Sequence, residues 1–456
     1  MIKSVHVFAG QYVNKYFDLK DRRIYENFTY RDKDDKLKLN PTRFINSLKH
    51  ICKIVVFNEY YLVYNYNTKI YDKLDEKNLS RIIKFILDTI DKSFWSLKLE
   101  SFIVTIINRD FEFITEIPIY ENYIFFENGI YSLKTKKLES YTPNILATYK
   151  INNKYIVGSR CDRFISFINT ITNNDNELAM LIQEIMGYAL VNNTKAQKFF
   201  LFYGEGSNGK SVLEALIRAM VGKDNTSSVS LEQLRSNFVI GNIVGKLVNI
   251  ASENESDFEV EKLKAITSGD SITIDQKYKE PYQYTPTCKM IFISNSLPNT
   301  SDNSYGFYRR LVIVPFNKTI KSDERDVNLT YKLLNEIEGI VQWAIAGLER
   351  LEKNNYQFTN PKEVSRVMDK YKEEQDPVYL FYKDKLIYKV GVRTNKKKIL
   401  ESYLLWLNAK MISPRGTDSS SKFWKELRRV TKSESIELDE TKSGNYYYIK
   451  NFELVA

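Results

Sequence analysis

Residues 203–211 read YGEGSNGKS, a stretch with three glycines and three small polar residues. The apolar run 199–202 precedes it, and the helix-like segment VLEALIRAM (212–220) follows it. A strand that leads into a helix through G-x-x-x-x-G-K-S is the pattern of a phosphate-binding loop. Small residues let backbone N–H groups approach phosphate oxygens, and the amino end of the helix adds a favourable dipole. The stretch predicts a nucleotide site, and a plain glycine-rich turn is the alternative.

Two side chains at the end of this loop have expected chemical roles. Lys210 would bring a mobile charge to the β- and γ-phosphates, and the Ser211 hydroxyl would ligate Mg²⁺. The prediction is therefore a site for ATP and Mg²⁺. The residues expected to hold the nucleotide are Gly204, Gly206, Ser207, Asn208, Gly209, Lys210, Ser211 and Val212.

Four short apolar segments lie at wide spacing in the middle of the chain. None alternates strictly between apolar and polar residues, which is typical of strands buried on both faces of an α/β sheet. We therefore expect an α/β core around the loop. The segments are KFFLFYG (198–204), KLVNIAS (246–252), KMIFISN (289–295) and RLVIVPF (310–316).

Charged and polar residues flank these expected strands. Glu253 and Glu255 follow the second strand, where they could hold Mg²⁺ and polarise water, or belong to a solvated acidic loop. Asn295 ends the third strand and could orient the hydrolytic water, although asparagine also ends strands as a turn residue. Arg309 and Arg310 precede the fourth strand, as a surface pair or as an arginine finger for a neighbouring subunit.

Residues 125–316 resemble the superfamily III helicases of phage, plasmid and poxvirus type, and the likeness extends to residue 351. Within that group the chain looks most similar to replication helicases of staphylococcal pathogenicity islands and related mobile elements. The segments that carry the resemblance, in order, are FFENGIYSL (125–133), LIQEIMGYAL (181–190), GEGSNGKS, KLVNIASENE, LKAITSGDSITIDQKYKEPYQYTPT (263–287), IFISNSLP (291–298), YRRLVIVPF and EIEGIVQWAIAGLERL (336–351).

The resemblance implies a hexameric AAA+-like motor that hydrolyses ATP with Mg²⁺, moves on single-stranded DNA and unwinds duplex DNA. It places Glu253 in the acidic second motif and Asn295 at the sensor position. It assigns the trans finger to Arg309 or Arg310, and Arg310 is the favoured candidate. It also matches ITIDQKYKEPYQY (272–284) to a DNA-gripping hairpin, with Lys277 and Lys279 in the central channel.

Two features depart from the family pattern. The second motif reads Ser-Glu-Asn-Glu (252–255) rather than an adjacent acidic pair, which leaves open which glutamate polarises water. The N-terminal region lacks the acidic pair and histidine of a primase site, so we expect no priming activity. A separate primase or other replication proteins are therefore candidate partners.

The C-terminal residues predict a small DNA-binding domain. KKKILESYLLWLNAK (396–410) and SSSKFWKELRRVTK (419–432) are expected helices, and SIELDETKSGNYYYIKNF (435–452) reads as two strands around a turn. Between residues 391 and 431, ten Lys/Arg stand against three Asp/Glu. These features favour a winged helix on duplex DNA, and a basic protein-docking helix is the alternative. The expected DNA contacts are Lys422, Lys425, Arg428 and Arg429.

Composition sets the remaining limits. The net charge of +10 fits a nucleic-acid partner or merely a basic surface. The three cysteines are far apart, and no apolar run reaches the ~18 residues of a membrane span, so we expect a cytoplasmic protein. The expected divisions are an α+β region of unassigned role (1–120), strands with a helical collar (121–195), the ATPase domain (196–375) and the winged helix (376–456).

Two other functions fit parts of the sequence. One is a DNA-binding replication initiator or regulator that uses ATP only to set its oligomeric state and has no motor activity. The other is a different ATPase class, such as a packaging motor or a small-molecule kinase. Turnover of ATP, and its response to DNA, would separate these from a helicase.

Overall fold

The structure is a computed structural model that describes residues 15–16, 28–252, 260–298, 300, 302, 304–414 and 416–455. The chain divides into two compact units, Met1–Tyr155 and Ile156–Ala456. Residues 121–155, which the sequence grouped with the helical collar, therefore belong to the first unit. No helix in the described ranges is both long and apolar enough to cross a membrane.

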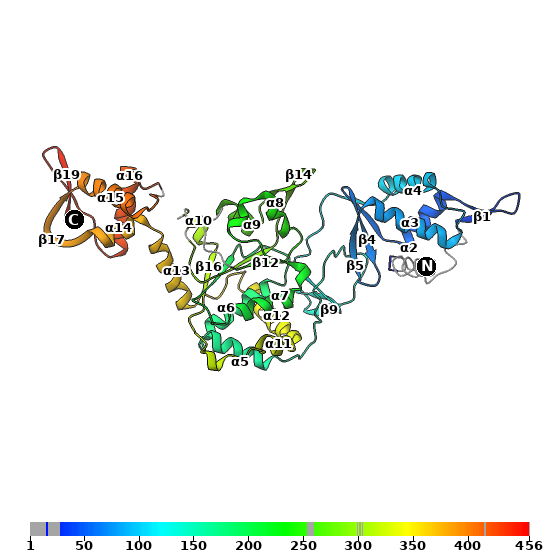
Figure 1. The fold of residues 1–456 in the computed structure, drawn as a ribbon, viewed down its shortest axis with the longest axis horizontal. Coiled ribbons are helices and arrows are strands. Elements are labelled where there is room, and N and C mark those ends of the chain that lie inside the picture. The colour runs from blue at the N-terminus through cyan, green and yellow to red at the C-terminus, as the bar shows by residue number, and fades with distance from the viewer. Residues whose placement is uncertain are drawn as a thin grey trace. The chain divides into compact units, whose positions relative to one another are not determined.

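The first unit mixes helices with short antiparallel sheets, as expected for an α+β region (Figure 1). One sheet has the strand order β5-β4-β3-β6, and its core lies among three helices. Asp75 caps the second of these helices by accepting a hydrogen bond from the backbone N–H of Asn78. The elements are α2 (Pro41–Ile51), β3 (Ile54–Phe57), β4 (Tyr60–Asn65), β5 (Ile70–Leu74), α3 (Glu76–Ile90), α4 (Leu97–Asp110) and β6 (Phe113–Ile114).

Two smaller sheets complete the first unit. A hairpin precedes the elements above, and a three-stranded antiparallel sheet follows them. The strands are β1 (Thr29–Arg31) and β2 (Leu37–Leu39), then β7 (Tyr123–Phe126), β8 (Gly129–Ser132) and β9 (Lys137–Glu139).

The second unit contains a five-stranded parallel sheet with the order β11-β12-β15-β10-β16. The four predicted strands are confirmed as β10 (Phe199–Tyr203), β12 (Val248–Ala251), β15 (Lys289–Ser294) and β16 (Leu311–Pro315). Nearly all of their residues are buried, because helices cover both faces. Sequence patterns did not reveal the short edge strand β11 (Thr226–Ser227).

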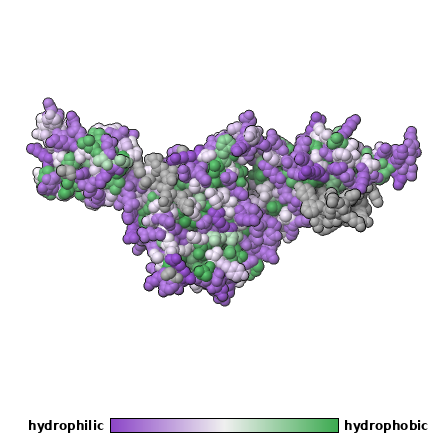
Figure 2. Space-filling view, viewed as in Figure 1, coloured by the Kyte–Doolittle hydropathy of each residue, from purple (hydrophilic) through white to green (hydrophobic). Residues whose placement is uncertain are grey.

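Figure 1 shows which helices cover which face of this sheet. One layer holds α5 (Asp162–Ile171), α6 (Asn176–Tyr188), α7 (Lys210–Val221), α11 (Leu329–Leu334) and α12 (Ile337–Lys353). The other holds α8 (Asn237–Ile240), α9 (Val260–Ser268) and α10 (Tyr305–Tyr308). Figure 2 shows many hydrophilic residues on the viewed face, with hydrophobic residues scattered among them.

A hairpin of β13 (Ile272–Gln276) and β14 (Lys279–Tyr284) lies between β12 and β15 in the chain. The helix α13 (Lys362–Glu374) follows the parallel sheet and its covering helices. The C-terminal segment then forms, in order, α14 (Pro377–Lys385), β17 (Leu386–Asn395), α15 (Lys396–Lys410), α16 (Ser420–Ser433), β18 (Glu440–Ser443) and β19 (Tyr446–Leu454). Its three strands form an antiparallel sheet of order β17-β19-β18.

Candidate nucleotide-binding site

The predicted phosphate-binding loop joins β10 to α7, as the sequence pattern requires. At two positions of the loop, close packing leaves no room for a side chain and requires glycine. A Cβ on Gly204 would stand 2.5 Å from the carbonyl oxygen of Phe316, and one on Gly209 would stand 2.5 Å from a methyl group of Ile171. Gly209 also has φ of 87°, in the left-handed region that favours glycine. Any larger residue at either position would displace the loop.

The backbone of the loop is open for an anion. In the described part of the chain, no backbone N–H from residue 205 to residue 211 donates to a protein acceptor. Buried or partly buried backbone donors are normally paired, so a run of unsatisfied N–H groups at a helix amino end is suited to phosphate oxygens. The exposed Ser211 hydroxyl lies at the same end of α7, where it could ligate a metal ion that accompanies a phosphate.

Lys210 is the first residue of α7 and is almost fully buried. Its Nζ donates to the Gly204 carbonyl and to Asn295 Oδ1, the latter at 3.3 Å. Burial lowers the pKa of the Lys210 ammonium below its ordinary value. Both hydrogen-bond acceptors of the ammonium are therefore neutral oxygens, and a negatively charged phosphate would bind it more strongly.

Asn295 reaches this site because β15 lies directly beside β10. Tyr203 pairs with Ser294 in the parallel register, so the residues after both strands leave the sheet at the same edge. In the structure, β12 is one strand further away, with β15 in between.

The predicted acidic residues cannot be placed, because Glu253 and Glu255 lie outside the described residues. Ser252, the last described residue after β12, donates to Glu214 Oε2 at 3.3 Å. Glu214 lies one turn along α7 from Lys210 and also pairs with Arg218 at 3.0 Å. The carboxyl end of β12 therefore packs against α7, the helix that begins at the loop.

The two arginines before β16 have different environments. The Arg310 guanidinium contacts Ser268 Oγ at 2.7 and 3.0 Å and the Gly306 carbonyl at 2.6 Å. Burial, followed by the nearby charge of Arg309, lowers the pKa of Arg310. Arg309 is exposed, and its guanidinium contacts Gln197 Oε1 at 3.0 Å. The favoured finger candidate, Arg310, is thus held within its own subunit, whereas Arg309 faces outward.

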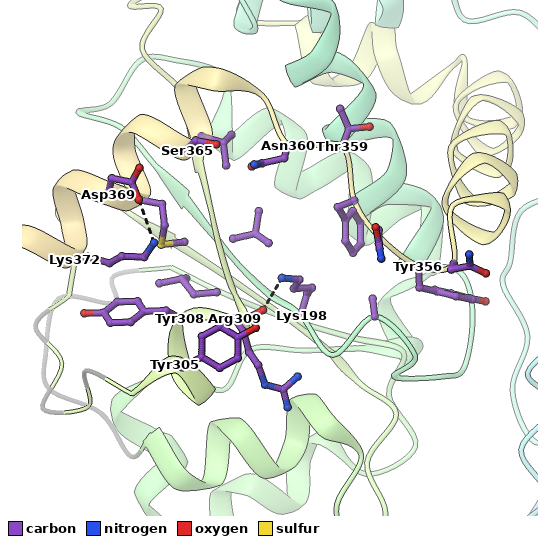
Figure 3. Close-up of a pocket in the computed structure, with 18 of the residues that line it drawn as sticks. Lys198, Tyr305, Tyr308, Arg309, Tyr356, Thr359, Asn360, Ser365, Asp369 and Lys372 are labelled. Carbon is purple, nitrogen blue, oxygen red and sulfur yellow. Dashed lines mark hydrogen bonds and ion pairs between the residues drawn. The ribbon is translucent and has the colours of Figure 1, made fainter. Parts of the chain in front are cut away.

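Arg309 lines a cavity of about 640 Å³ at the amino ends of β10 and β16, the edge opposite the loop. Figure 3 shows Lys198 beside Arg309, with Nζ of Lys198 2.5 Å from the Arg309 carbonyl oxygen. Within the described ranges, no carboxylate forms an ion pair with either side chain. Burial and the charge of Arg309 lower the pKa of Lys198, in that order. Asp369, which also lines this cavity, pairs with Lys372 at 3.1 Å, so Lys198 and Arg309 face the cavity without an ion-pair partner in the described ranges.

The predicted hairpin is confirmed, and its tip is fully accessible. Lys277 and Tyr278 form the turn between β13 and β14, and Lys279 begins the return strand. All three are exposed, Tyr278 completely at 102%. Charged and aromatic side chains at an exposed tip are suited to a nucleic-acid backbone and bases.

The predicted C-terminal helices are confirmed to within one residue at each end. Lys422 and Lys425 are exposed along α16. The two arginines on the same helix instead bind carboxylates. Arg428 pairs with Glu440 at 2.5 Å, and Arg429 pairs with Asp376 and with Glu426. The structure therefore separates the four predicted DNA contacts into two available lysines and two arginines with internal partners.

The sequence did not indicate Arg325, which lies next to the loop. Its Nη2 donates to Ser207 Oγ at 2.6 Å although the two residues are 118 positions apart. No motif marks this arginine, because the segment after β16 has no fixed pattern of its own.

The chain is similar to several known proteins. A model described as a family of unknown function (DUF5906) matches residues 202–310. A protein of Acanthamoeba polyphaga mimivirus named "putative helicase" is 25% identical over 312 residues, which cover 61% of this chain and 32% of that protein. A protein of Invertebrate iridescent virus 3 with the same description is 22% identical over 343 residues, covering 66% and 36%. The chain thus spans about a third of the length of these relatives.

A solved structure, the apo C-terminal region of NrS-1, has a similar fold. It superposes with a TM-score of 0.52 at 13% identity, and covers 89% of this chain and 97% of that one. This likeness concerns the fold alone. Together the comparisons relate the chain to viral proteins named as helicases and show a mixed α/β fold with a solved counterpart.

Proposed function

We propose that this chain is an ATP-driven DNA helicase that acts in replication of a phage, plasmid or genomic island. The observation that carries the proposal is the loop of residues 204–211. It offers unpaired backbone N–H groups beside Lys210, and Asn295 lies within 3.3 Å of that lysine. The viral relatives named as helicases, and the exposed hairpin with its two lysines, support a nucleic-acid motor rather than a small-molecule kinase.

The site would bind ATP with Mg²⁺. The N–H groups and Lys210 would hold the phosphates, Ser211 would ligate Mg²⁺, and Glu253 or Glu255 would complete the metal and water site. Bound Mg²⁺ would neutralise charge that develops on the phosphates. Asn295 would orient the attacking water from the strand next to the loop.

The protein would act as a ring, proposed as a hexamer, with single-stranded DNA in contact with Lys277 and Lys279. We propose Arg309, rather than Arg310, as the residue that reaches the nucleotide of the neighbouring subunit. Arg309 faces outward beside Lys198, and neither has a carboxylate partner in the described part of the chain. Arg310 already binds Ser268 and Gly306 and would hold that surface in shape.

The C-terminal segment would be a winged helix that binds duplex DNA, and the order of its elements supports this proposal. A helix, a strand, two helices and a two-stranded hairpin follow one another, and the first strand joins the hairpin in one sheet. In that arrangement α16 would be the recognition helix, and Lys422 and Lys425 would contact DNA phosphates.

The test is ATP hydrolysis with and without single-stranded DNA. The proteins are wild type, Lys210→Ala, Arg309→Ala, Arg310→Ala and an equimolar mixture of the first two variants. We expect DNA-stimulated turnover in wild type, loss in the Lys210 and Arg309 variants, and partial recovery on mixing. Recovery arises because some interfaces pair an intact loop with an intact finger. Turnover indifferent to DNA and to both arginines would favour a different ATPase, and no turnover would favour a non-motor initiator.

A further inference from the structure

A segment that follows β16 crosses the phosphate-binding loop. The backbone carbonyl of Phe316 accepts a hydrogen bond from Asn208 Nδ2 at 3.0 Å. The backbone N–H of Ile320 donates to the Ser207 carbonyl at 2.8 Å. Arg325 then donates to Ser207 Oγ at 2.6 Å. Residues 316–325, which we call the strap, are thereby fixed on the two central residues of the loop.

The charge of Arg325 has no counter-ion in the described part of the chain. Its other hydrogen bond joins Nε to the Ile320 carbonyl at 3.3 Å, so both of its partners are neutral oxygens. Asp326, the next residue, pairs instead with Lys332 at 2.6 Å. An arginine that neighbouring carboxylates leave unpaired is available for another anion.

The position of Arg325 specifies which anion it can meet. Its guanidinium is anchored on Ser207, within the run of loop residues whose backbone N–H groups have no protein acceptor. Ser207 adopts φ of 49°, and its carbonyl already accepts a hydrogen bond from the backbone N–H of Ile320 in the strap. A phosphate seated on those N–H groups would lie next to the guanidinium, which binds phosphate through several parallel N–H donors.

We propose that Arg325 contacts the phosphates of the nucleotide bound in its own subunit, and so adds a second cation to Lys210. This inference rests on the proposed nucleotide site and deepens it. It distinguishes Arg325 from Arg309, which acts across a subunit boundary. Arg325 would therefore strengthen nucleotide binding in each isolated subunit, whatever the assembly state of the ring.

The experiment measures binding to the full-length chain with Mg²⁺. Labelled ATP is titrated first, and unlabelled ATP or inorganic tripolyphosphate then displaces it. Tripolyphosphate has no base or ribose, so it isolates the phosphate contact. The proteins are wild type, Arg325→Ala, Arg325→Lys, Ser207→Ala, Lys210→Ala and Lys321→Ala. Lys321 is an exposed cation of the strap and serves as the control.

We expect Arg325→Ala to weaken ATP and tripolyphosphate by the same factor, about 10-fold or more, because charge-assisted hydrogen bonds to phosphate are strong. Arg325→Lys should recover part of the loss, Ser207→Ala should show a smaller loss, and Lys321→Ala should bind like wild type. Thermal unfolding midpoints equal to that of wild type would show that the Arg325 variants are folded.

Three results would overturn the inference. Wild-type affinity for both ligands in Arg325→Ala would make the strap a purely structural clamp. Weaker ATP binding with unchanged tripolyphosphate binding would place Arg325 on the ribose or base. If wild type does not bind ATP and does not differ from Lys210→Ala, the proposed function itself is wrong. This outcome differs from the other two because all of the variants then bind ATP equally poorly.

Discussion

The Lys210 ammonium lies 3.3 Å from Asn295 Oδ1, although the two residues are 85 positions apart in the chain. The contact exists because β15 is inserted between β10 and β12. This strand order brings the side chain of Asn295, which follows β15, to Lys210, which begins α7. A nucleotide phosphate on the loop would compete with Asn295 for Lys210, which would release the amide to hold a water molecule.

Asn295→Ala should therefore impair hydrolysis more than binding. We expect the turnover number for ATP to fall by at least about 10-fold, with the dissociation constant for ATP changed by no more than about 3-fold. Single-turnover hydrolysis and equilibrium binding of a labelled nucleotide measure the two quantities. Ser296→Ala, at the exposed neighbouring position, is the control. An equal loss in binding would mean that Asn295 shapes the pocket rather than the chemical step.

The hairpin tip gives a prediction about coupling. Tyr278 is completely exposed, so its removal should not alter stability. Tyr278→Ala should weaken single-stranded DNA binding by about 1–3 kcal/mol through loss of base stacking, and Tyr278→Phe, which keeps the ring, should not. Fluorescence anisotropy with a labelled oligonucleotide measures the affinity. Equal affinity in all three proteins would remove the tyrosine from the DNA contact.

Lys277→Ala should separate ATP turnover from unwinding, because it would remove the proposed contact with a DNA phosphate without altering the phosphate-binding loop. We expect hydrolysis in the absence of DNA to stay at the wild-type rate while duplex unwinding is lost. A strand-displacement assay run beside the hydrolysis assay measures both. Normal unwinding by this variant would place Lys277 outside the DNA channel.

The sequence predicted the buried strands and the loop because their residues carry local signals. Apolar runs such as 199–202 and the spacing from Gly204 to Ser211 are sufficient for that. The order of the strands in the sheet could not be predicted in this way. It depends on the crossover connections between parallel strands, and no local residue pattern indicates their course. This explains why the insertion of β15 between β10 and β12 was not foreseen.

Side-chain partners across long separations were missed for the same reason. Arg429 falls on a basic face of α16 by helical spacing, yet its partner Asp376 is 53 residues away at the start of α14. Arg325 shows the reverse case, since nothing in its local sequence marks it as a neighbour of Ser207. In both cases the tertiary fold determines the contact, so periodicity alone assigned Arg429 to DNA and gave Arg325 no role.

Lys289 predicts a pH dependence of stability. It is only 2% exposed, donates to the Val191 carbonyl and to the Thr287 carbonyl at 3.2 Å, and burial lowers its pKa to about 7. Between that value and the ordinary lysine pKa of 10.5, the unfolded chain binds more protons than the folded chain. Lys289 should therefore make stability rise with pH above 7, by up to about 1.4 kcal/mol per pH unit.

The matched variant is Lys289→Met, which keeps the length of the side chain but does not titrate. As the pH rises from 7 to 9, the unfolding free energy of wild type should increase relative to that of this variant. Urea unfolding at several pH values, with both proteins in the same buffers, measures this difference and cancels the titration of other groups. A difference that stays constant over this range would show that Lys289 does not change protonation there.

The C-terminal segment provides the last prediction, because its basic residues have different partners. Lys422→Ala with Lys425→Ala should weaken duplex DNA binding and reduce the slope of log affinity against log salt by about 2, with stability unchanged. Arg429→Ala should instead destabilise the segment by about 1–3 kcal/mol. It leaves Asp376, which caps α14 through the N–H groups of Val378 and Tyr379, as a buried carboxylate without its cation.

The pH dependence separates these two roles. Burial raises the pKa of Asp376, and the Arg429 charge acts against that rise. The carboxylate needs Arg429 only while it is ionised, so the destabilisation by Arg429→Ala should be full above the folded-state pKa of Asp376 and should shrink as the pH falls through it. Calorimetric unfolding of the full chain at pH 7 and at acid pH, with Asp376→Asn as the non-titrating control, measures this. If Arg429→Ala were as stable as wild type at pH 7 and lost duplex affinity, Arg429 would be a DNA contact after all.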